Sequence, residues 1–261
     1  MLKDKFGIIF GVANKRSIAW ATAQSLHDAG ARLAFTYQGD RLKENVEGLT
    51  AESMSESLLL PCDVTKQEEV DETFKRVGEE FGRLDFLIHS IAYAPREALG
   101  GEYLDTSREA FLTALEISAY SLVQLARAAT PLMTEGGSIV CMSYYGAEKV
   151  VAGYNVMGVA KAALEASTRY LANDLGPRNV RVNAVAPGFT RTPMTEAFLA
   201  DERIAGIYRN ETALGQLTEP GQVAATVSWL AAPDCFTTGE TIAVSGGAQL
   251  LRLPTGAELR G

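Results

Sequence analysis

Cysteine and histidine are scarce in this sequence, and their scarcity excludes several kinds of site. The 261 residues hold three cysteines, Cys62, Cys141 and Cys235, which lie 79 and 94 positions apart. That spacing offers neither a CxxC zinc knuckle nor a dense disulfide framework, so we expect small buried thiols in a reducing compartment. The two histidines, His27 and His89, are too few for an HExxH zinc site, and the GxSxG turn of many hydrolases is absent. We expect no metal site.

Long hydrophobic runs and an excess of positive charge are also missing. The apolar run that begins at Phe6 stops at Gly11, so the start of the chain resembles neither a signal peptide nor a membrane span. The 24 Lys and Arg residues are outnumbered by 32 Asp and Glu, which gives a net charge of −8. Such a charge argues against a general polyanion-binding protein. We therefore expect a cytoplasmic protein with no nucleic-acid or membrane partner.

The chain is long enough for one large domain, and 47% of its residues are hydrophobic. Short apolar runs alternate along it with stretches of helical periodicity. The predicted strands are Phe6–Phe10, Arg32–Thr36, Ser57–Leu60, Leu84–His89, Ser138–Met142, Val180–Val185 and Thr241–Val244. The predicted helices are Ser17–Ala29, Arg41–Met54, Gln67–Phe81, Ser107–Met133, Tyr154–Leu175 and Gly221–Ala231. This alternation predicts an α/β fold, a single doubly wound Rossmann-type domain over residues 1–261 whose seven-stranded parallel sheet is flanked by helices.

The segment Phe189–Leu217 departs from the alternation because it contains no predicted strand. It mixes Pro193, Gly206 and Gly215 with apolar side chains. Long excursions from a compact domain often carry function, so we predict a substrate lid over residues 189–217.

The turn after the first strand has the character of a phosphate-binding corner. In a doubly wound sheet, ligands bind beyond the carboxyl ends of the strands. Gly11 permits a tight turn, and the amide groups that open the helix at Ser17 could face an anionic pyrophosphate. The turn has one glycine and is not GxGxxG, so by itself it fits an ordinary strand–helix corner about as well.

The ends of the second and third strands bear on the cofactor. NAD-binding proteins often carry an acid after the second strand and NADP-binding proteins a nearby Arg, but Gln38 is neither. Its amide could bind the ribose, and the next cation is three residues on, at Arg41, so NAD is favoured over NADP. Asp63 could accept a hydrogen bond from the adenine amino group, or it could cap the helix that begins at Gln67.

Tyr154 and Lys161 are seven residues apart on one predicted helix. They would share a face two turns apart, with about 10 Å of rise, so direct contact is not expected. Because a helical Lys leans toward the N-terminus, its ammonium could reach cofactor ribose hydroxyls while Tyr154 addresses the substrate. A surface Tyr and a solvated Lys are the alternative for this pair taken alone.

Taken together, these segments resemble the short-chain dehydrogenase/reductase superfamily, and within it the NADH-dependent enoyl-[acyl-carrier-protein] reductases of the FabI type. The resemblance runs along the whole chain and is carried by Gly11…Ser17-Ile18-Ala19, Thr36-Tyr37-Gln38, Cys62-Asp63-Val64, His89-Ser90-Ile91-Ala92-Tyr93-Ala94-Pro95 and Tyr144…Tyr154…Lys161.

Three departures from the superfamily pattern point to that branch. The usual catalytic Tyr lies four residues before the Lys, where this chain has Met157, whereas the gap of seven to Tyr154 is typical of the branch. Tyr144 stands seventeen residues before the Lys, in place of the usual Ser. No Asn occurs between Asp105 and Met133 to match the superfamily's relay Asn. In contrast, Ala186–Thr192 resembles the PGxxxT of the wider superfamily more than the GPIRT of the branch, with Thr192 aligned near the carboxamide.

The resemblance implies reduction of a trans-2-enoyl thioester by NADH, the last step of the fatty-acid elongation cycle. It implies that Tyr154 stabilises the enolate oxygen, that Lys161 binds the ribose and lowers the Tyr pKa, and that Tyr144 lines the pocket. The catalytic residues implied are Tyr144, Tyr154 and Lys161. The cofactor-binding residues implied are Gly11, Ser17, Ile18, Gln38, Asp63, Val64, Ser90, Ile91, Lys161, Thr190 and Thr192. The substrate-binding residues implied are Tyr93, Ala94, Tyr144, Tyr154, Met157 and Phe198, with Met194 and Ile204 also in the acyl slot. Packing in the lid or core is the alternative for each apolar residue of this slot.

The resemblance also implies a homotetramer and an acyl carrier protein as partner. That partner is strongly acidic, so a chain of net charge −8 would need a local basic surface, for which Arg191, Arg203 and Arg209 are candidates. Two other functions stay open. A reductase of a C=O group, such as a 3-oxoacyl thioester, is disfavoured by the gap of seven and by Tyr144. A non-catalytic dinucleotide-sensing protein would have no reason to keep Tyr154 and Lys161 together.

Overall fold

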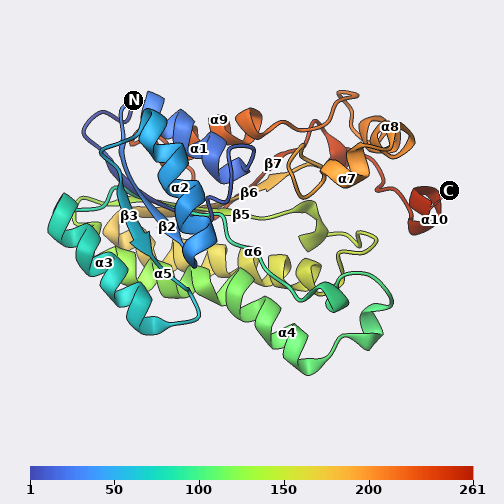
Figure 1. Cartoon of the computed structure of the whole chain (residues 1–261), viewed down its shortest axis with the longest axis horizontal. Helices are drawn as coiled ribbons and strands as arrows, with labels where there is room; N and C mark the ends of the chain where they lie inside the picture. The colour runs from blue at the N-terminus through green and yellow to red at the C-terminus, as the bar shows by residue number, and fades with distance from the viewer. Residues whose placement is uncertain (261) are drawn as a thin grey trace.

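Seven parallel strands form one sheet in the computed structural model, which describes residues 1–260 (Figure 1). The strands are β1 Phe6–Phe10, β2 Arg32–Tyr37, β3 Leu58–Pro61, β4 Phe86–His89, β5 Gly137–Met142, β6 Val180–Pro187 and β7 Thr241–Val244. Their order across the sheet is β3-β2-β1-β4-β5-β6-β7. The predicted fold class and all seven predicted strands are confirmed, with ends that shift by no more than two residues.

The strand order places a switch point between β1 and β4. From β1 the chain moves outward through β2 to β3 and then crosses back to β4 on the other side. Consecutive connections therefore leave the sheet in opposite directions at this point, the place where doubly wound sheets form a ligand-binding crevice beyond the carboxyl ends of the strands. Both strand ends carry residues that the sequence assigns to a cofactor site.

Helices cover both faces of the sheet (Figure 1). One face packs against α1 Ile18–Asp28, α2 Asp40–Ser53 and α9 Pro220–Ala231, which share a hydrophobic cluster with the strands. The other face packs against α3 Gln67–Phe81, α5 Ser121–Ala129 and α6 Asn155–Leu175 through a second cluster. Because the central strands β1, β4, β5 and β6 bury side chains on both sides, they consist largely of apolar residues.

Helix α3 shows how the sequence specifies these packed helices. Its buried residues Val70, Phe74, Val77 and Phe81 recur at helical spacing on the side facing the sheet. The helix ends at Gly82, which has a left-handed φ of 72° and donates its amide to the Gly78 carbonyl.

The long helical stretch predicted over Ser107–Met133 has the expected extent but not a uniform geometry. It consists of α4 Arg108–Leu115, a π-helical segment Glu116–Tyr120, α5 and a final 3₁₀ turn Thr130–Leu132. Apolar periodicity does not reveal a π-helical segment, and such segments often mark functional sites.

The segment between β6 and α9 contains two short helices, α7 Glu196–Leu199 and α8 Glu202–Asn210, and no strand. A parallel bridge between Thr190 and Thr218 closes its two ends against each other. A short helix that the sequence analysis did not predict, α10 Gly256–Arg260, follows β7. Within residues 1–260 no helix combines the length and apolar character that a membrane crossing requires.

Candidate active site

Tyr144 and Tyr154 lie together just beyond the carboxyl end of β5. Their ring centroids are 4.9 Å apart and their planes meet at 66°, the edge-to-face arrangement that aromatic pairs favour. Burial raises the pKa of the Tyr154 phenol above its ordinary value, and the neighbouring Tyr144 raises it further. Burial raises the pKa of Tyr144 in the same way. Lys161 is not among the groups that shift the Tyr154 pKa here, so the expected lowering is not observed, and both phenols are neutral donors at physiological pH.

Two glycines make room for the Tyr154 ring. A Cβ atom on Gly146 would lie 2.6 Å from a ring carbon of Tyr154, and one on Gly158 would lie 2.8 Å from the Gly146 carbonyl oxygen. The 3₁₀ turn Tyr145–Ala147 therefore lies directly against the first turns of α6. A larger side chain at either glycine would displace the ring or the helix.

Tyr154 does not lie on the helix, which corrects the sequence-based prediction. It is the residue before α6, and the helix begins at Asn155, whose φ of 38° is positive. The Asn155 side-chain amide donates to the Gly100 carbonyl over 2.7 Å, which fixes this entry to the helix. Tyr154 is thus positioned by a turn that the Asn155–Gly100 hydrogen bond braces, and its side chain gains a defined orientation from it.

Lys161 is buried one turn and a half into α6, with 4% of its surface exposed. Its Nζ donates to the Met142 carbonyl oxygen over 2.6 Å, at the end of β5. Burial lowers the pKa of the Lys161 ammonium to about 8, although the neighbouring Cys141 and Glu165 act to raise it. The structure therefore brings Tyr144, Tyr154 and Lys161 to the same strand end.

The loop after β4 is fastened to the π-helical segment by a residue that the sequence analysis missed. The Ser118 hydroxyl accepts from the Tyr93 amide at 2.9 Å and donates to the Tyr93 carbonyl at 3.0 Å. The Tyr93 side chain itself is half exposed. A serine inside a helical pattern is a weak sequence signal, and its partners lie 25 residues away.

Ala94 and Met157, both predicted to contact the substrate, lie beside Tyr154. Both are buried in a cluster of alanines and Val156 against which the Tyr154 ring packs. Their burial fits the core-packing alternative, and their contact with the Tyr154 ring places them next to the predicted acyl slot.

Gly11 and Ser90 define the floor of the crevice between β1 and β4. Gly11 has a φ of 100°, and a Cβ there would lie 2.1 Å from the Ser90 carbonyl oxygen. The Ser90 amide donates to the Phe10 carbonyl over 3.0 Å, and Ile91 packs against the adjoining core. Both the conformation and the close approach require glycine at position 11.

Helix α1 opens toward the same crevice. The Ser17 hydroxyl caps the helix by accepting from the Trp20 amide at 3.1 Å. The amides of Ile18 and Ala19 have no main-chain acceptor in the described part of the chain. They form a positive helix end that suits a phosphate.

Gln38 and Asp63 lie next to each other at the ends of β2 and β3. The Asp63 carboxylate accepts from the Thr65 amide at 3.0 Å and from its hydroxyl at 2.7 Å. Burial acts to raise the pKa of this carboxyl, but hydrogen bonds from Thr65 and Gln38 outweigh it and hold the pKa below its ordinary value. The residue that precedes α3 is Lys66, so the helix-cap alternative for Asp63 is not observed. Val64, the remaining residue predicted here, is buried.

Three threonines fix the start of the segment 189–217. The Thr190 hydroxyl donates to the Gly188 carbonyl over 2.8 Å, and the Thr195 hydroxyl donates to the Thr190 carbonyl over 2.6 Å. The Thr192 amide donates to the Thr195 hydroxyl over 3.0 Å. Thr195 was not predicted, because the PGxxxT motif ends before it.

The remaining apolar candidates lie on the segment 189–217 with different exposure. Phe198 is 56% exposed and Met194 85% exposed, whereas Ile204 is half-buried. Tyr208, which the sequence analysis missed, stacks on Phe189 with centroids 3.7 Å apart. A small pocket runs past this stack toward the tyrosines of the site, and it is lined by Tyr144, Tyr145, Gly188, Phe189, Tyr208, Glu211, Thr212, Ala248, Leu253 and Pro254.

The three arginines predicted as a basic surface all have partners. Arg191 pairs with Glu219, and Arg209 with Glu202. Arg203 donates to the carbonyls of Glu258 and Leu259 in α10. A further pair, Arg16 with Glu196 at 2.6 Å, joins the nucleotide turn to α7.

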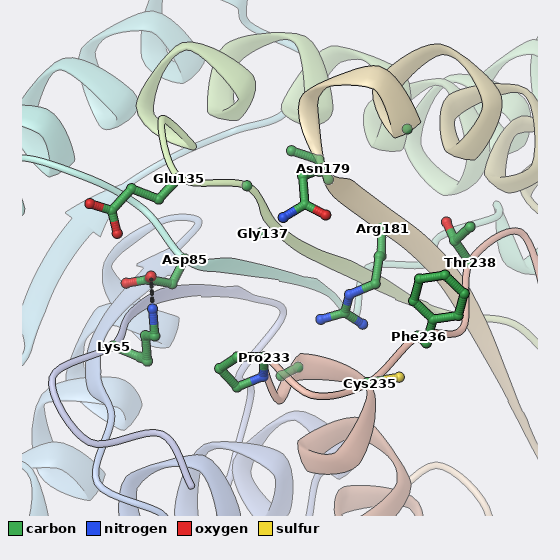
Figure 2. A pocket seen from close by; sticks show the side chains of 14 residues that line it. Lys5, Asp85, Glu135, Gly137, Asn179, Arg181, Pro233, Cys235, Phe236 and Thr238 are labelled. Carbon is green, nitrogen blue, oxygen red and sulfur yellow. Dashed lines mark hydrogen bonds and ion pairs between the residues drawn. The ribbon is translucent and has the colours of Figure 1, made fainter.

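A larger hollow lies at the opposite end of the sheet, where β1, β4, β5 and β6 begin (Figure 2). Its polar groups already hold the chain together: Lys5 pairs with Asp85 at 2.8 Å, and Arg181 donates to the Leu230 and Ala232 carbonyls at the end of α9. None of the predicted site residues lines it.

The site geometry agrees with comparisons to known proteins. Residues 11–249 match the family described as Enoyl-(Acyl carrier protein) reductase. The NADH-dependent enoyl-[acyl-carrier-protein] reductase FabI of Bacillus cereus is 46% identical over 96% of this chain and 99% of its own length, and that of Bacillus subtilis is 46% identical over 92% and 94%. The crystal structure of the Anaplasma phagocytophilum enoyl-(acyl-carrier-protein) reductase in complex with NAD superposes with a TM-score of 0.91, at 43% identity, covering 97% of each chain. The chain belongs to the enoyl-(acyl carrier protein) reductase family.

Proposed function

We propose that this chain reduces the trans-2 double bond of enoyl-acyl-carrier-protein thioesters with NADH, in the last step of fatty-acid elongation, and that Tyr154, Lys161 and Tyr144 perform it. The activity follows from the family and from its NADH-dependent relatives. The observation that carries the residue roles is the half-buried tyrosine pair, in edge-to-face contact, at the strand end to which Lys161 is bonded.

The residues at the switch point suit a dinucleotide. Gly11 keeps the crevice clear of side chains, and the free amides of Ile18 and Ala19 provide donors for a pyrophosphate. Gln38 and Asp63 would hold the adenosine end, with Val64, Ser90 and Ile91 beside it and Thr190 and Thr192 near the nicotinamide. When bound, NADH supplies the hydride that reaches the β-carbon of the enoyl group.

Tyr154 would stabilise the negative charge that builds on the thioester oxygen. Its phenol is protonated, because burial raises its pKa, and a protonated phenol can donate to an oxyanion. Removal of such a donor in other enzymes costs about 3–4 kcal/mol of transition-state stabilisation. The phenol does not need to lose its proton for this role, so the raised pKa favours it.

Lys161 would hold the cofactor ribose. An ammonium has three donors, and one of them is used on the Met142 carbonyl, which leaves two for hydroxyl groups. The strand end thereby orients the ammonium, because the carbonyl that accepts from it belongs to the sheet.

Tyr93 and Tyr144 would contact the acyl chain, with Phe198 and Met194 on a lid formed by residues 189–217 of a single domain. Ala94 and Met157 would act from beneath, by supporting the Tyr154 ring. The exposure of Tyr93, Phe198 and Met194 supports this division.

The acyl carrier protein would dock near this lid. Arg191 and Arg209 each face a carboxylate, and Arg203 also lies 3.9 Å from Asp201, so their positive charge is largely offset locally. Attraction of an acidic partner would require these pairs to open, and exposed pairs of this kind are individually weak.

We further propose a homotetramer and a cytoplasmic location. Exposed apolar side chains on three helices, Leu112 on α4, Tyr170 on α6 and Trp229 on α9, support contact between copies of the chain. The three cysteines are free and buried, which suits a reducing compartment. Light scattering after size exclusion would reveal the assembly directly.

The loss of NADH absorbance tests the activity against its alternatives. We expect oxidation of NADH with crotonyl-CoA and none with acetoacetyl-CoA. Activity only with acetoacetyl-CoA would indicate a C=O reductase, and activity with neither would indicate a sensing protein. Lys161→Ala should weaken NADH binding in a direct titration, and unchanged binding would refute the role given to Lys161.

A further inference from the structure

Glu165 is a buried acid beside the site that the proposed mechanism does not use. It lies one turn beyond Lys161 on α6 and is 7% exposed. Its carboxylate accepts a hydrogen bond from the Ser143 hydroxyl. Burying a carboxyl group costs free energy, so the contacts that compensate for this cost indicate what Glu165 does.

Ser143 lies directly after β5, between two residues that contact the site. The residue before it, Met142, accepts from Lys161, and the residue after it, Tyr144, packs against Tyr154. The Ser143 amide donates to the Val185 carbonyl over 2.7 Å, so its backbone is tied to β6. Its hydroxyl is hydrogen-bonded to Glu165 of α6. One helical turn earlier on the same helix, Lys161 is hydrogen-bonded to the Met142 carbonyl.

Glu165 follows Lys161 by four residues on α6, so the two side chains lie on the same face of the helix. The other titratable groups near the ammonium are Cys141 on β5 and His89 on β4. Burial raises the pKa of the Cys141 thiol to about 11 and lowers that of His89 to about 3, so both are neutral near pH 7. Glu165 therefore supplies the negative charge among the groups that act on Lys161.

Glu165 has neighbours of its own that set its ionisation. Burial raises the pKa of its carboxyl, and Glu148 adds to this, whereas Ser143, Arg169 and Lys161 lower it. The hydrogen bond from Ser143 thus favours the carboxylate form that Lys161 requires.

We propose that Glu165 is a positioning residue for the tyrosine–lysine site, which fixes the end of β5 through Ser143 and places a negative charge beside Lys161, four residues away on α6. The inference rests on the proposed role of Lys161 in holding the cofactor.

Glu165→Gln separates the two contributions, because the amide keeps the size and an oxygen for Ser143 but removes the charge. We expect the pH at which NADH binding weakens to fall by about one unit, since loss of an opposite charge lowers the pKa of Lys161. Titration of the Lys161 ammonium by NMR in the cofactor-free enzyme should show the same shift. Glu165→Asp should restore the parent midpoint, and Asp174→Asn, which removes a carboxylate near the far end of α6, should leave it unchanged.

Ser143→Ala tests the mechanical part. It keeps the charge of Glu165 and removes the tie, so kcat should fall about fivefold, the equivalent of one ordinary hydrogen bond, with little change in the pH midpoint. The inference is overturned if Glu165→Gln titrates like Asp174→Asn, or if Ser143→Ala has the parent kcat. If Lys161→Ala fails to weaken NADH binding, the role of Lys161 fails instead, so the two failures are distinguishable.

Discussion

Replacing Tyr154 by Phe should remove most of the catalytic rate while leaving the fold and the cofactor affinity intact. The substitution deletes one hydroxyl and keeps the ring, whose edge-to-face contact with Tyr144 at 4.9 Å does not involve the oxygen. Lys161 is bonded to the Met142 carbonyl over 2.6 Å, so its position does not depend on that oxygen either. The expected change is therefore confined to the stabilisation of the developing oxyanion.

The magnitude follows from the character of the lost donor. A preorganised neutral donor in a buried site contributes about 3–4 kcal/mol, which corresponds to a fall in kcat of about 10²–10³-fold. The free energy of unfolding should change by no more than about 0.5 kcal/mol, because no buried group loses a partner. Steady-state kinetics with crotonyl-CoA, NADH titration by fluorescence and chemical denaturation measure the three quantities.

Tyr145→Phe is the matched control. Its hydroxyl donates to the Gln249 carbonyl over 2.9 Å, so its removal should lower stability by about 1 kcal/mol and leave kcat nearly unchanged. A fall in kcat of less than about tenfold for Tyr154→Phe would refute the oxyanion argument, since the lost stabilisation would then be below about 1.4 kcal/mol.

Three further predictions test other parts of the site. Gly11→Ala should abolish NADH binding and lower the unfolding temperature. Gly39→Ala is the control, because φ is 74° there but no atom lies within 4 Å, so only the modest cost of a positive φ is expected. Equal effects of the two substitutions would contradict the close approach of Gly11 to the Ser90 carbonyl. Raising the pH through about 8 should weaken NADH binding, because Lys161 loses its proton. Between about pH 8 and 10.5 the free energy of unfolding of the cofactor-free enzyme should rise relative to that of Lys161→Met, because the unfolded chain binds more protons there. If the difference in unfolding free energy did not change with pH, the lowered pKa would be contradicted. Ser118→Ala should raise the KM for crotonyl-CoA and leave NADH affinity unchanged, and a parent KM would show that its two hydrogen bonds do not position the loop after β4.

The sheet could be predicted from the sequence because its strands have a recognisable apolar pattern. In a parallel sheet covered on both faces, strands are short and largely apolar. Phe6–Phe10 and Val180–Pro187 have this character and lie between stretches of helical periodicity, so they are recognised as strands. The strand ends could be predicted for the same reason, since turn residues such as Gly11 mark them.

The helix entry at Tyr154 shows where such prediction fails. Helical periodicity extends through Tyr154, but Asn155 takes a positive φ and turns the chain at that point. Asn tolerates this conformation better than most residues, yet it does not require it, so the break depends on the distant Gly100 carbonyl that holds its side chain.

Ala94 and Met157 show a second limit. Pattern and resemblance place both residues near Tyr154, where the structure has them, but how deeply each side chain is buried depends on packing around the alanines of α4. The raised pKa of Tyr154 was missed for a related reason, because burial is a property of the assembled site and no spacing in the sequence reports it.

The bridge between Thr190 and Thr218 gives the segment that carries α7 and α8 a particular mechanical character. Because its two ends are joined to each other beside β6, the segment can change shape without transmitting strain to the strands. Some of its links to the rest of the chain, such as Arg16 with Glu196, are exposed ion pairs that dissolved salt weakens, whereas the hydrogen bond from the Leu214 amide to the Gly246 carbonyl is not ionic. We therefore expect slow amide hydrogen exchange in the sheet and fast exchange within this segment, with the change between them at Thr190 and Thr218. Raising the ionic strength should speed exchange within the segment and leave exchange in the sheet unchanged.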